Sequence, residues 1–165
     1  MEPRATARAA TREVLVFVLG KEEYGVDILK VQEIRGYEKV TPLPAAPDFL
    51  KGVVNLRGTI VPVIDLRVKF GMANPTYDAF TVVVILRVAA RVIGIVVDGV
   101  SDVIALAAAD VKAAPQLGSL VDSSYLAGLA TQNERMILLL DIEKFLSGAE
   151  LNLLAAAADA ARSPA

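Results

Sequence analysis

The sequence predicts a mainly β protein made of two copies of one small β unit. Residues 14–104 are rich in Val and Ile, which form runs of four to eight residues between Gly, Pro and Asn. Such runs are typical of buried strands rather than of helices. Segments of the first half also match segments of the second half at fixed spacings, which indicates an internal repeat. Short strands at close spacing favour barrels, because closing a sheet removes its unpaired edges.

The expected elements follow from the local pattern in chain order. Nine runs are predicted to be strands: Val14–Leu19, Tyr24–Ile28, Val31–Arg35, Val53–Arg57, Thr59–Ile64, Thr81–Leu86, Val92–Val97, Val100–Leu106 and Met136–Leu140. Residues 65–70 are expected to form one or two helical turns with Asp65 as the N-cap. A C-terminal helix is expected from Asp141 to about Leu154, with Asp141 as its N-cap.

The internal repeat appears as two separate matches. Residues 25–34 match residues 94–103 at an offset of 69. Residues 48–52 match 124–128, and residues 60–66 match 136–142, both at an offset of 76. Two diverged copies of one unit of roughly 60 residues explain both offsets, and a unit that small has a marginal core alone. We therefore expect the copies to pack together, with a binding groove between them.

Composition excludes several classes of protein. The chain has 165 residues and contains neither Cys nor His, which excludes disulfides, Cys- or His-ligated zinc, cysteine nucleophiles and Ser-His-Asp triads. The longest stretch without a charged residue, 123–133, is shorter than the roughly 20 residues of a spanning helix, so we expect no membrane insertion. A net charge of −2 argues against nucleic-acid binding, which favours a basic face. We expect no enzyme, no metal site and no cofactor.

Two alternatives to this interpretation stay open. An enzyme could use paired carboxylates, such as those of Asp98 and Asp102 or of Asp27 and Asp65, for acid–base chemistry. A small barrel could also bind nucleic acid through a basic face with exposed aromatic residues. The scarcity of chemical groups and the high apolar content favour a protein-binding module over both alternatives.

The segment 51–66 is predicted to be a β-hairpin with a charged residue inside it. Asn55 and Gly58 supply turn chemistry between two apolar strands. Arg57 lies within this apolar hairpin and should be paired or face a partner, and Glu33 is the expected mate. If the pair is buried, removing one member costs about 3–5 kcal/mol. The alternative is that both side chains point to solvent.

The strings 25–34, 49–66 and 94–103 closely resemble the CheW family of bacterial chemotaxis coupling proteins. The likeness runs from about Val14 to Leu154. It implies two packed, five-stranded SH3-like β-barrels with short helices and a C-terminal helix. The implied single domain, 14–154, consists of subdomains at about 14–80 and 81–150 with possible strand exchange. Residues 1–13 are then a flexible N-terminal tail, and residues 155–165 an Ala-rich tail.

The resemblance also implies a function. It implies a non-enzymatic cytoplasmic adaptor that links the tips of methyl-accepting chemoreceptors to the histidine kinase CheA in membrane-associated arrays. Carried over by position, the receptor-binding groove comprises Ile28, Val31, Gly52, Val82, Gly94 and Val103. Glu33 and Arg57 match the charged pair of the family. A regulatory CheW-like module of another kinase or scaffold system is the alternative. From the residues alone, a core position is the favoured interpretation of Val31.

Overall fold

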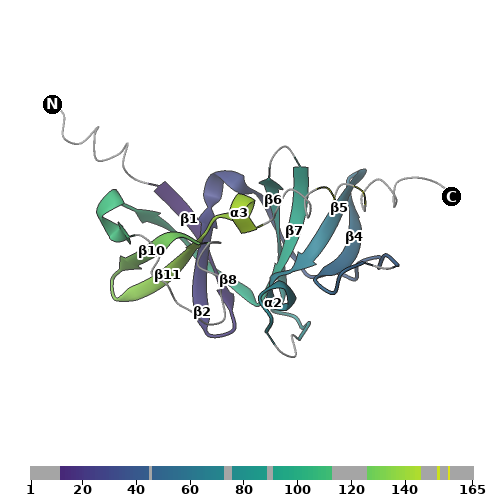
Figure 1. Ribbon diagram of the computed structural model, residues 1–165, viewed down its shortest axis with the longest axis horizontal. Helices are drawn as coiled ribbons and strands as arrows, with labels where there is room; N and C mark the ends of the chain where they lie inside the picture. The colour runs from purple at the N-terminus through teal and green to yellow at the C-terminus, as the bar shows by residue number, and fades with distance from the viewer. Residues whose placement is uncertain are drawn as a thin grey trace.

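Two curled β-sheets and a few helical turns make up the computed structural model (Figure 1). It describes residues 12–44, 46–72, 76–88, 91–112, 126–145, 152 and 156. The two sheets pack against each other through one shared apolar core, so the predicted mainly β fold of two packed units is confirmed. Among the described residues, no helix has the length and hydropathy needed to cross a membrane.

The first sheet has six strands rather than the five expected. Their order is β8 (Gly99–Leu106), β1 (Arg12–Leu19), β2 (Glu22–Asp27), β11 (Arg135–Leu140), β10 (Leu126–Gln132) and β9 (Val111–Lys112). The extra strand, β9, is only two residues long. Neighbouring strands are antiparallel except β2 and β11, which run parallel. β1 begins at Arg12, so the last two residues of the expected N-terminal tail belong to the sheet.

The second sheet has the five strands expected. Their order is β3 (Val31–Gly36), β6 (Val82–Val88), β7 (Arg91–Val97), β5 (Thr59–Asp65) and β4 (Leu50–Leu56). Here β5 and β7 are the parallel pair. An isolated bridge between Thr41 and Val53 lies beside β4. It corresponds to the pairing of β9 with β10 in the first sheet.

Short helical turns join the strands. They are η1 (Ile28–Lys30), α2 (Leu66–Lys69), η2 (Ala108–Asp110) and α3 (Ile142–Phe145). Both predicted N-caps are confirmed, because Asp65 accepts from the amide of Arg67 and Asp141 accepts from the amide of Glu143. Of the expected C-terminal helix beyond α3, the structure describes only Asn152, which is helical. The rest of that helix, and residues 1–11, lie outside the described residues.

The chain does not divide between the sheets at residue 80, as two contiguous subdomains would. β1 and β2 join β8–β11 in the first sheet, whereas β3–β7 form the second sheet. Strands that are far apart in the sequence therefore share the first sheet. The chain crosses between the sheets twice, once through η1 and once at Asp98, the single residue between β7 and β8.

The repeat in the sequence is a repeat in strand geometry. The hairpins β4–β5 and β10–β11 are related by the offset of 76 and carry a bulge at the same place. In the first hairpin the register shifts between Leu50 and Gly52, and in the second it shifts between Leu126 and Gly128. β2 and β7 are related by the offset of 69, and each lies parallel to the second strand of its hairpin.

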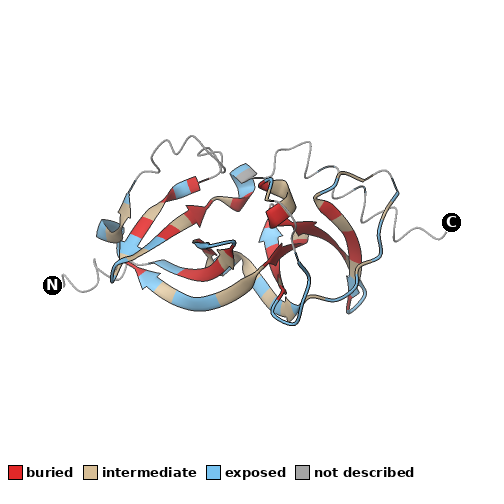
Figure 2. Cartoon of the chain, turned by 90° about the horizontal axis from the view of Figure 1, so that it is seen from below, coloured by how far each residue is buried: buried red, intermediate tan, exposed pale blue. Residues whose placement is uncertain are grey.

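The continuous apolar runs reflect strands that are buried on both faces. Along β1, Leu15 and Phe17 belong to the core shared by the two sheets. The alternating Val14 and Val16 belong to a separate small core inside the first sheet. The second sheet has its own inner core as well. Runs of consecutive buried residues therefore lie along the central strands of both sheets (Figure 2).

Candidate functional site

Apolar side chains from both sheets lie at the margin of the shared core. Ile28, Val31, Val82 and Val100 are partly buried and pack against it. Val31 and Val82 come from the second sheet, Val100 comes from the first, and Ile28 lies on the crossing η1. Three of these four residues were predicted to belong to the partner-binding groove.

Two half-exposed residues extend the same margin. Val103 in β8 is 49% exposed and lies opposite Leu15 of the shared core. Ile34 in β3 is 45% exposed and lies opposite Val84 of the shared core. Directly opposed residues of antiparallel strands point to the same face, so both side chains extend from the faces that pack together. We call Ile28, Val31, Ile34, Val82, Val100 and Val103 the inter-sheet rim.

Sequence reasoning predicted Val103 but missed Ile34. The offset of 69 between the two repeat units relates Ile34 directly to Val103, so the signal was present in the repeat. The same offset relates Val31 to Val100. The rim therefore draws equivalent positions from the two edge strands β3 and β8.

Gly52 and Gly94, which the resemblance places in the groove, are not among the residues of the inter-sheet rim. Both residues are buried. A Cβ on Gly94 would lie 2.9 Å from Cγ1 of Val83, and a Cβ on Gly52 would overlap the carbonyl oxygen of Thr41. These neighbours belong to the same half of the molecule as the glycines themselves. Gly52 is needed because the Thr41 backbone approaches closely, whereas at Gly94 the packed side chains of Val83 and Ile85 occupy the space that a Cβ would take.

Glu33 and Arg57 form the predicted ion pair, but the pair is not buried. Arg57 donates to Oε1 of Glu33, and Arg35 donates to Oε2 at 3.0 Å. The hydrogen bond from Arg57, followed by that from Arg35, holds the pKa of Glu33 below its usual range. The Arg57 side chain is 67% exposed. An exposed pair contributes about 0–1 kcal/mol, so the larger cost for a buried pair does not apply.

The predicted turn at Asn55 and Gly58 is also present. The side chain of Asn55 accepts from the amide of Gly58 at 2.8 Å. Arg57 and Gly58 both have positive φ, at 51° and 89°, as the favoured two-residue hairpin turn requires. A non-glycine residue in this conformation costs roughly 1 kcal/mol. The turn directs Arg57 back to Glu33, which lies opposite Ile85 on the face of β3 away from the rim.

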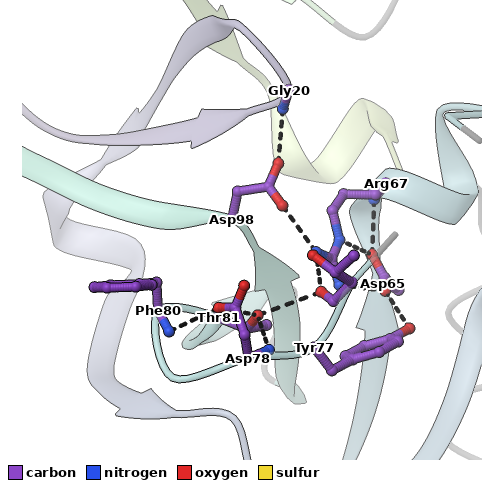
Figure 3. Close-up of polar contacts among 9 residues, drawn as sticks. Gly20, Asp65, Arg67, Tyr77, Asp78, Phe80, Thr81 and Asp98 are labelled. Atoms are coloured by element: carbon purple, nitrogen blue, oxygen red, sulfur yellow. Dashed lines mark hydrogen bonds and ion pairs between the residues drawn. The ribbon is translucent and has the colours of Figure 1, made fainter. Parts of the chain in front are cut away.

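A buried ionic network, which sequence reasoning missed, lies where the two sheets meet (Figure 3). Arg67 is 2% exposed and binds both carboxylate oxygens of Asp65 at 3.0 Å. It also donates to Asp98 at 2.8 Å, and Tyr77 donates to Asp65. Burial raises the pKa of Asp65, but the hydrogen bonds from Arg67 and Tyr77 outweigh it and hold that pKa below its usual range.

The carboxylates considered for catalysis have structural partners. Asp65 and Asp98 bind Arg67. Asp102 binds Arg135, which also binds Glu23, and the hydrogen bond from Arg135 lowers the pKa of Asp102. Asp27 accepts from the amide of Leu29. Among the residues that the structure describes, no group of acidic side chains could hold a metal ion. This arrangement favours protein binding over acid–base chemistry.

Comparison with known proteins gives the same answer for fold and family. The model of the CheW-like domain matches residues 13–150. The chemotaxis protein CheW of Klebsiella aerogenes is 56% identical over 143 residues, covering 87% of this chain and 86% of that protein. The chemotaxis protein CheW of Rhizobium meliloti is 34% identical over 139 residues, covering 84% and 90%.

A solved structure is similar over most of its length. The crystal structure of the scaffolding protein TtCheW from Thermoanaerobacter tengcongensis superimposes with a TM-score of 0.77 at 29% sequence identity. The match covers 84% of this chain and 94% of that one.

Proposed function

The chain belongs to the CheW family of non-enzymatic chemotaxis adaptors, and on this premise we propose that it joins the cytoplasmic tips of methyl-accepting chemoreceptors to the histidine kinase CheA. We place it in the cytoplasm, recruited to membrane-associated receptor arrays. An adaptor must bind both partners at once, so the receptor and the kinase need separate surfaces.

The inter-sheet rim carries the receptor half of this proposal. Its half-exposed members, Ile34 and Val103, stand beside partly buried neighbours on the margin of the shared core. An amphipathic helix recognises such a surface by laying its apolar face on it. The tip of a chemoreceptor, as a helical hairpin, would supply that face. Glu33 and Arg57 lie on the other face of β3 and would act as the charged pair at a separate point of partner contact.

The proposed coupling can be tested by reconstitution. The rate of CheA autophosphorylation is measured in membranes that carry a chemoreceptor, with and without the purified protein. We expect receptor-dependent stimulation that an attractant suppresses. No stimulation with cognate partners and folded protein would contradict coupling and would favour a CheW-like module of another kinase or scaffold system.

The first prediction concerns the rim itself. Val103→Glu places a charge on a half-exposed rim position, where desolvating that charge opposes an apolar contact. We expect at least about a tenfold loss of receptor-tip affinity, equivalent to about 1.4 kcal/mol, with an unchanged melting curve. Val103 is a cleaner probe than Val31, which packs against the core.

Met136→Glu is the matched control for this substitution. Met136 is 61% exposed, but β11 is separated from β8 by β1 and β2. We expect this control to bind like the wild type. Equal losses in both variants would remove the rim from the receptor interface.

A further inference from the structure

The two places where the chain crosses between the sheets lie near opposite ends of β1. The crossing at η1 follows β2, whose last residue Asp27 pairs with Val14. The crossing at Asp98 is bonded to the other end of β1, where the Asp98 amide donates to the carbonyl of Val18 at 3.0 Å. The mutual angle of the sheets therefore depends on what holds these two crossings.

Asp98 is bound by groups from both sheets. Its Oδ1 accepts from Arg67, which follows β5 of the second sheet, at 2.8 Å. Its Oδ2 accepts from the amide of Gly20, between β1 and β2 of the first sheet, at 2.7 Å. One carboxylate thus bridges the two sheets with both of its oxygens (Figure 3).

Arg67 is held rigidly for this contact. Its Nε and one terminal nitrogen bind the two oxygens of Asp65, and the other terminal nitrogen binds Asp98 and the carbonyl of Thr76. The ring of Tyr77 lies 4.9 Å from the guanidinium carbon. A planar guanidinium with its donors engaged in this way has a defined direction.

The shared apolar core and this ionic contact constrain the two sheets in different ways. Burial of apolar surface is non-directional, so the core holds the sheets together over a range of angles. Hydrogen bonds are directional, so the bond from the fixed Arg67 to Asp98 and the bond from Gly20 to the same carboxylate restrict that angle. Rim residues such as Val31 and Val103 belong to different sheets, so their spacing changes whenever that angle changes.

We propose that Arg67 and Asp98 form a clasp that fixes the mutual orientation of the two sheets and thereby positions the inter-sheet rim for its partner. Arg67 and Asp98 are positioning residues, because they act through the rim. The positioning of the rim for a receptor rests on the proposed function. The clasp itself rests on the geometry alone.

The substitution Asp98→Asn should break the clasp without unfolding the protein. The amide replaces one of the two acceptor oxygens with a donor NH2 group, so the donor that faced that oxygen, Gly20 or Arg67, loses its hydrogen bond there. The Asp98 side chain is 33% exposed, so water can solvate the substituted side chain itself. The buried pair of Asp65 and Arg67 is retained. We therefore expect the variant to stay folded, which a thermal melt followed by circular dichroism checks.

The orientation of the sheets can be measured directly, because the chain has no native cysteine. Spin labels are attached at Thr59→Cys in β5 and Thr131→Cys in β10, two exposed positions in different sheets. Double electron–electron resonance then gives the distribution of distances between them. In the otherwise wild-type protein we expect one narrow peak, and with Asp98→Asn a broadened or shifted one.

Two further variants make the test specific. Asp110→Asn is the matched control, since Asp110 bonds Ala107 and Gln132, both in the half of the chain that forms the first sheet. It should keep the narrow peak. Asp98→Glu keeps two acceptor oxygens and should restore much of the narrow distribution. An unchanged distribution in Asp98→Asn would overturn the clasp.

Binding of a purified cytoplasmic receptor fragment tests the positioning role. If the competent orientation falls to a fraction of the population, the apparent Kd rises by the inverse of that fraction, and we expect a rise of about threefold to tenfold. A broadened distance distribution with unchanged affinity would overturn the positioning role. If the wild type does not bind the fragment, the receptor proposal and the positioning role both fail. The clasp is then judged only by the distances between the spin labels.

Discussion

The aspartate at the centre of the buried network depends on two neighbours. Asp65 is fully buried, and its negative charge is balanced by Arg67 and by the hydroxyl of Tyr77. Burial and the hydrogen bond to Asp65 raise the pKa of Tyr77, so its hydroxyl remains a donor at neutral pH. The Asp65 side chain also caps α2 by accepting a hydrogen bond from the amide of Arg67. One carboxylate thus serves a helix start, an ion pair and an aromatic contact.

Tyr77→Phe should lower stability and shift acid unfolding. The hydrogen bond to a charged acceptor is lost, which costs about 1–3 kcal/mol, and the pKa of Asp65 rises towards its usual value. A carboxylate with a lowered folded pKa stabilises the protein above its unfolded pKa of about 3.9, and this contribution is lost as the pH falls through the folded pKa. Acid unfolding of the variant should therefore begin at a higher pH.

Urea unfolding at pH 7 and an acid titration followed by circular dichroism measure both effects. Tyr37→Phe is the control, because Tyr37 packs on Tyr77 with ring centroids 4.7 Å apart while the bond from Tyr77 to Asp65 stays in place. An acid midpoint that moves equally in both variants would assign the effect to the loss of a nearby tyrosine hydroxyl rather than to the hydrogen bond with Asp65.

The hairpins β4–β5 and β10–β11 show how one element is used twice with different side chains. Both turns place two residues at positive φ, Arg57 and Gly58 in one and Asn133 and Glu134 in the other. Asn tolerates this conformation better than Arg does. Each hairpin therefore holds one unfavoured residue in this conformation, Arg57 in the first and Glu134 in the second. In the first hairpin, this conformation lets Arg57 reach Glu33 on the edge strand β3.

Arg57→Asn should separate turn stability from the charged pair. Asparagine relieves the strain of the turn, and loss of an exposed ion pair costs about 0–1 kcal/mol, so the free energy of unfolding should stay within about 1 kcal/mol of wild type. If the pair faces a partner, receptor-dependent CheA activation should fall. Arg91→Asn, which removes another exposed arginine of the second sheet, is the control and should retain full activation. Wild-type activation by Arg57→Asn would remove the pair from the mechanism.

At the scale of the whole molecule, the two sheets are interlocked rather than merely adjacent. Strands from the start of the chain complete the first sheet, and one apolar core draws residues from both sheets. Neither sheet can therefore unfold without exposing the core of the other.

Unfolding in urea should accordingly be a single cooperative transition. A fluorescent label at Thr59→Cys reports on the second sheet, and one at Thr131→Cys reports on the first. We expect both labels and the circular dichroism signal to give the same midpoint. Two separated midpoints would show that the sheets are independent units.

Most of the strands could be predicted because a strand that is buried on both faces has a continuous run of Val and Ile in its own sequence. β10 was missed, because its sequence LAGLATQ is rich in Ala and Gly and carries little β propensity. The repeat contained the missing information, since residues 124–128 match residues 48–52 at the start of β4.

The sequence by itself determined the mainly β class, the duplication, the helix caps, the turn at Asn55 and Gly58 and the family, all of which depend on short strings of residues. Only the tertiary structure decided which strands share a sheet, that Gly52 and Gly94 are buried, and that Ile34 belongs to the rim. The contact of Arg67 with Asp98, 31 residues apart, was likewise decided only by the tertiary structure. The physical reason is that burial and pairing depend on neighbours brought together by strand order, which no local pattern encodes.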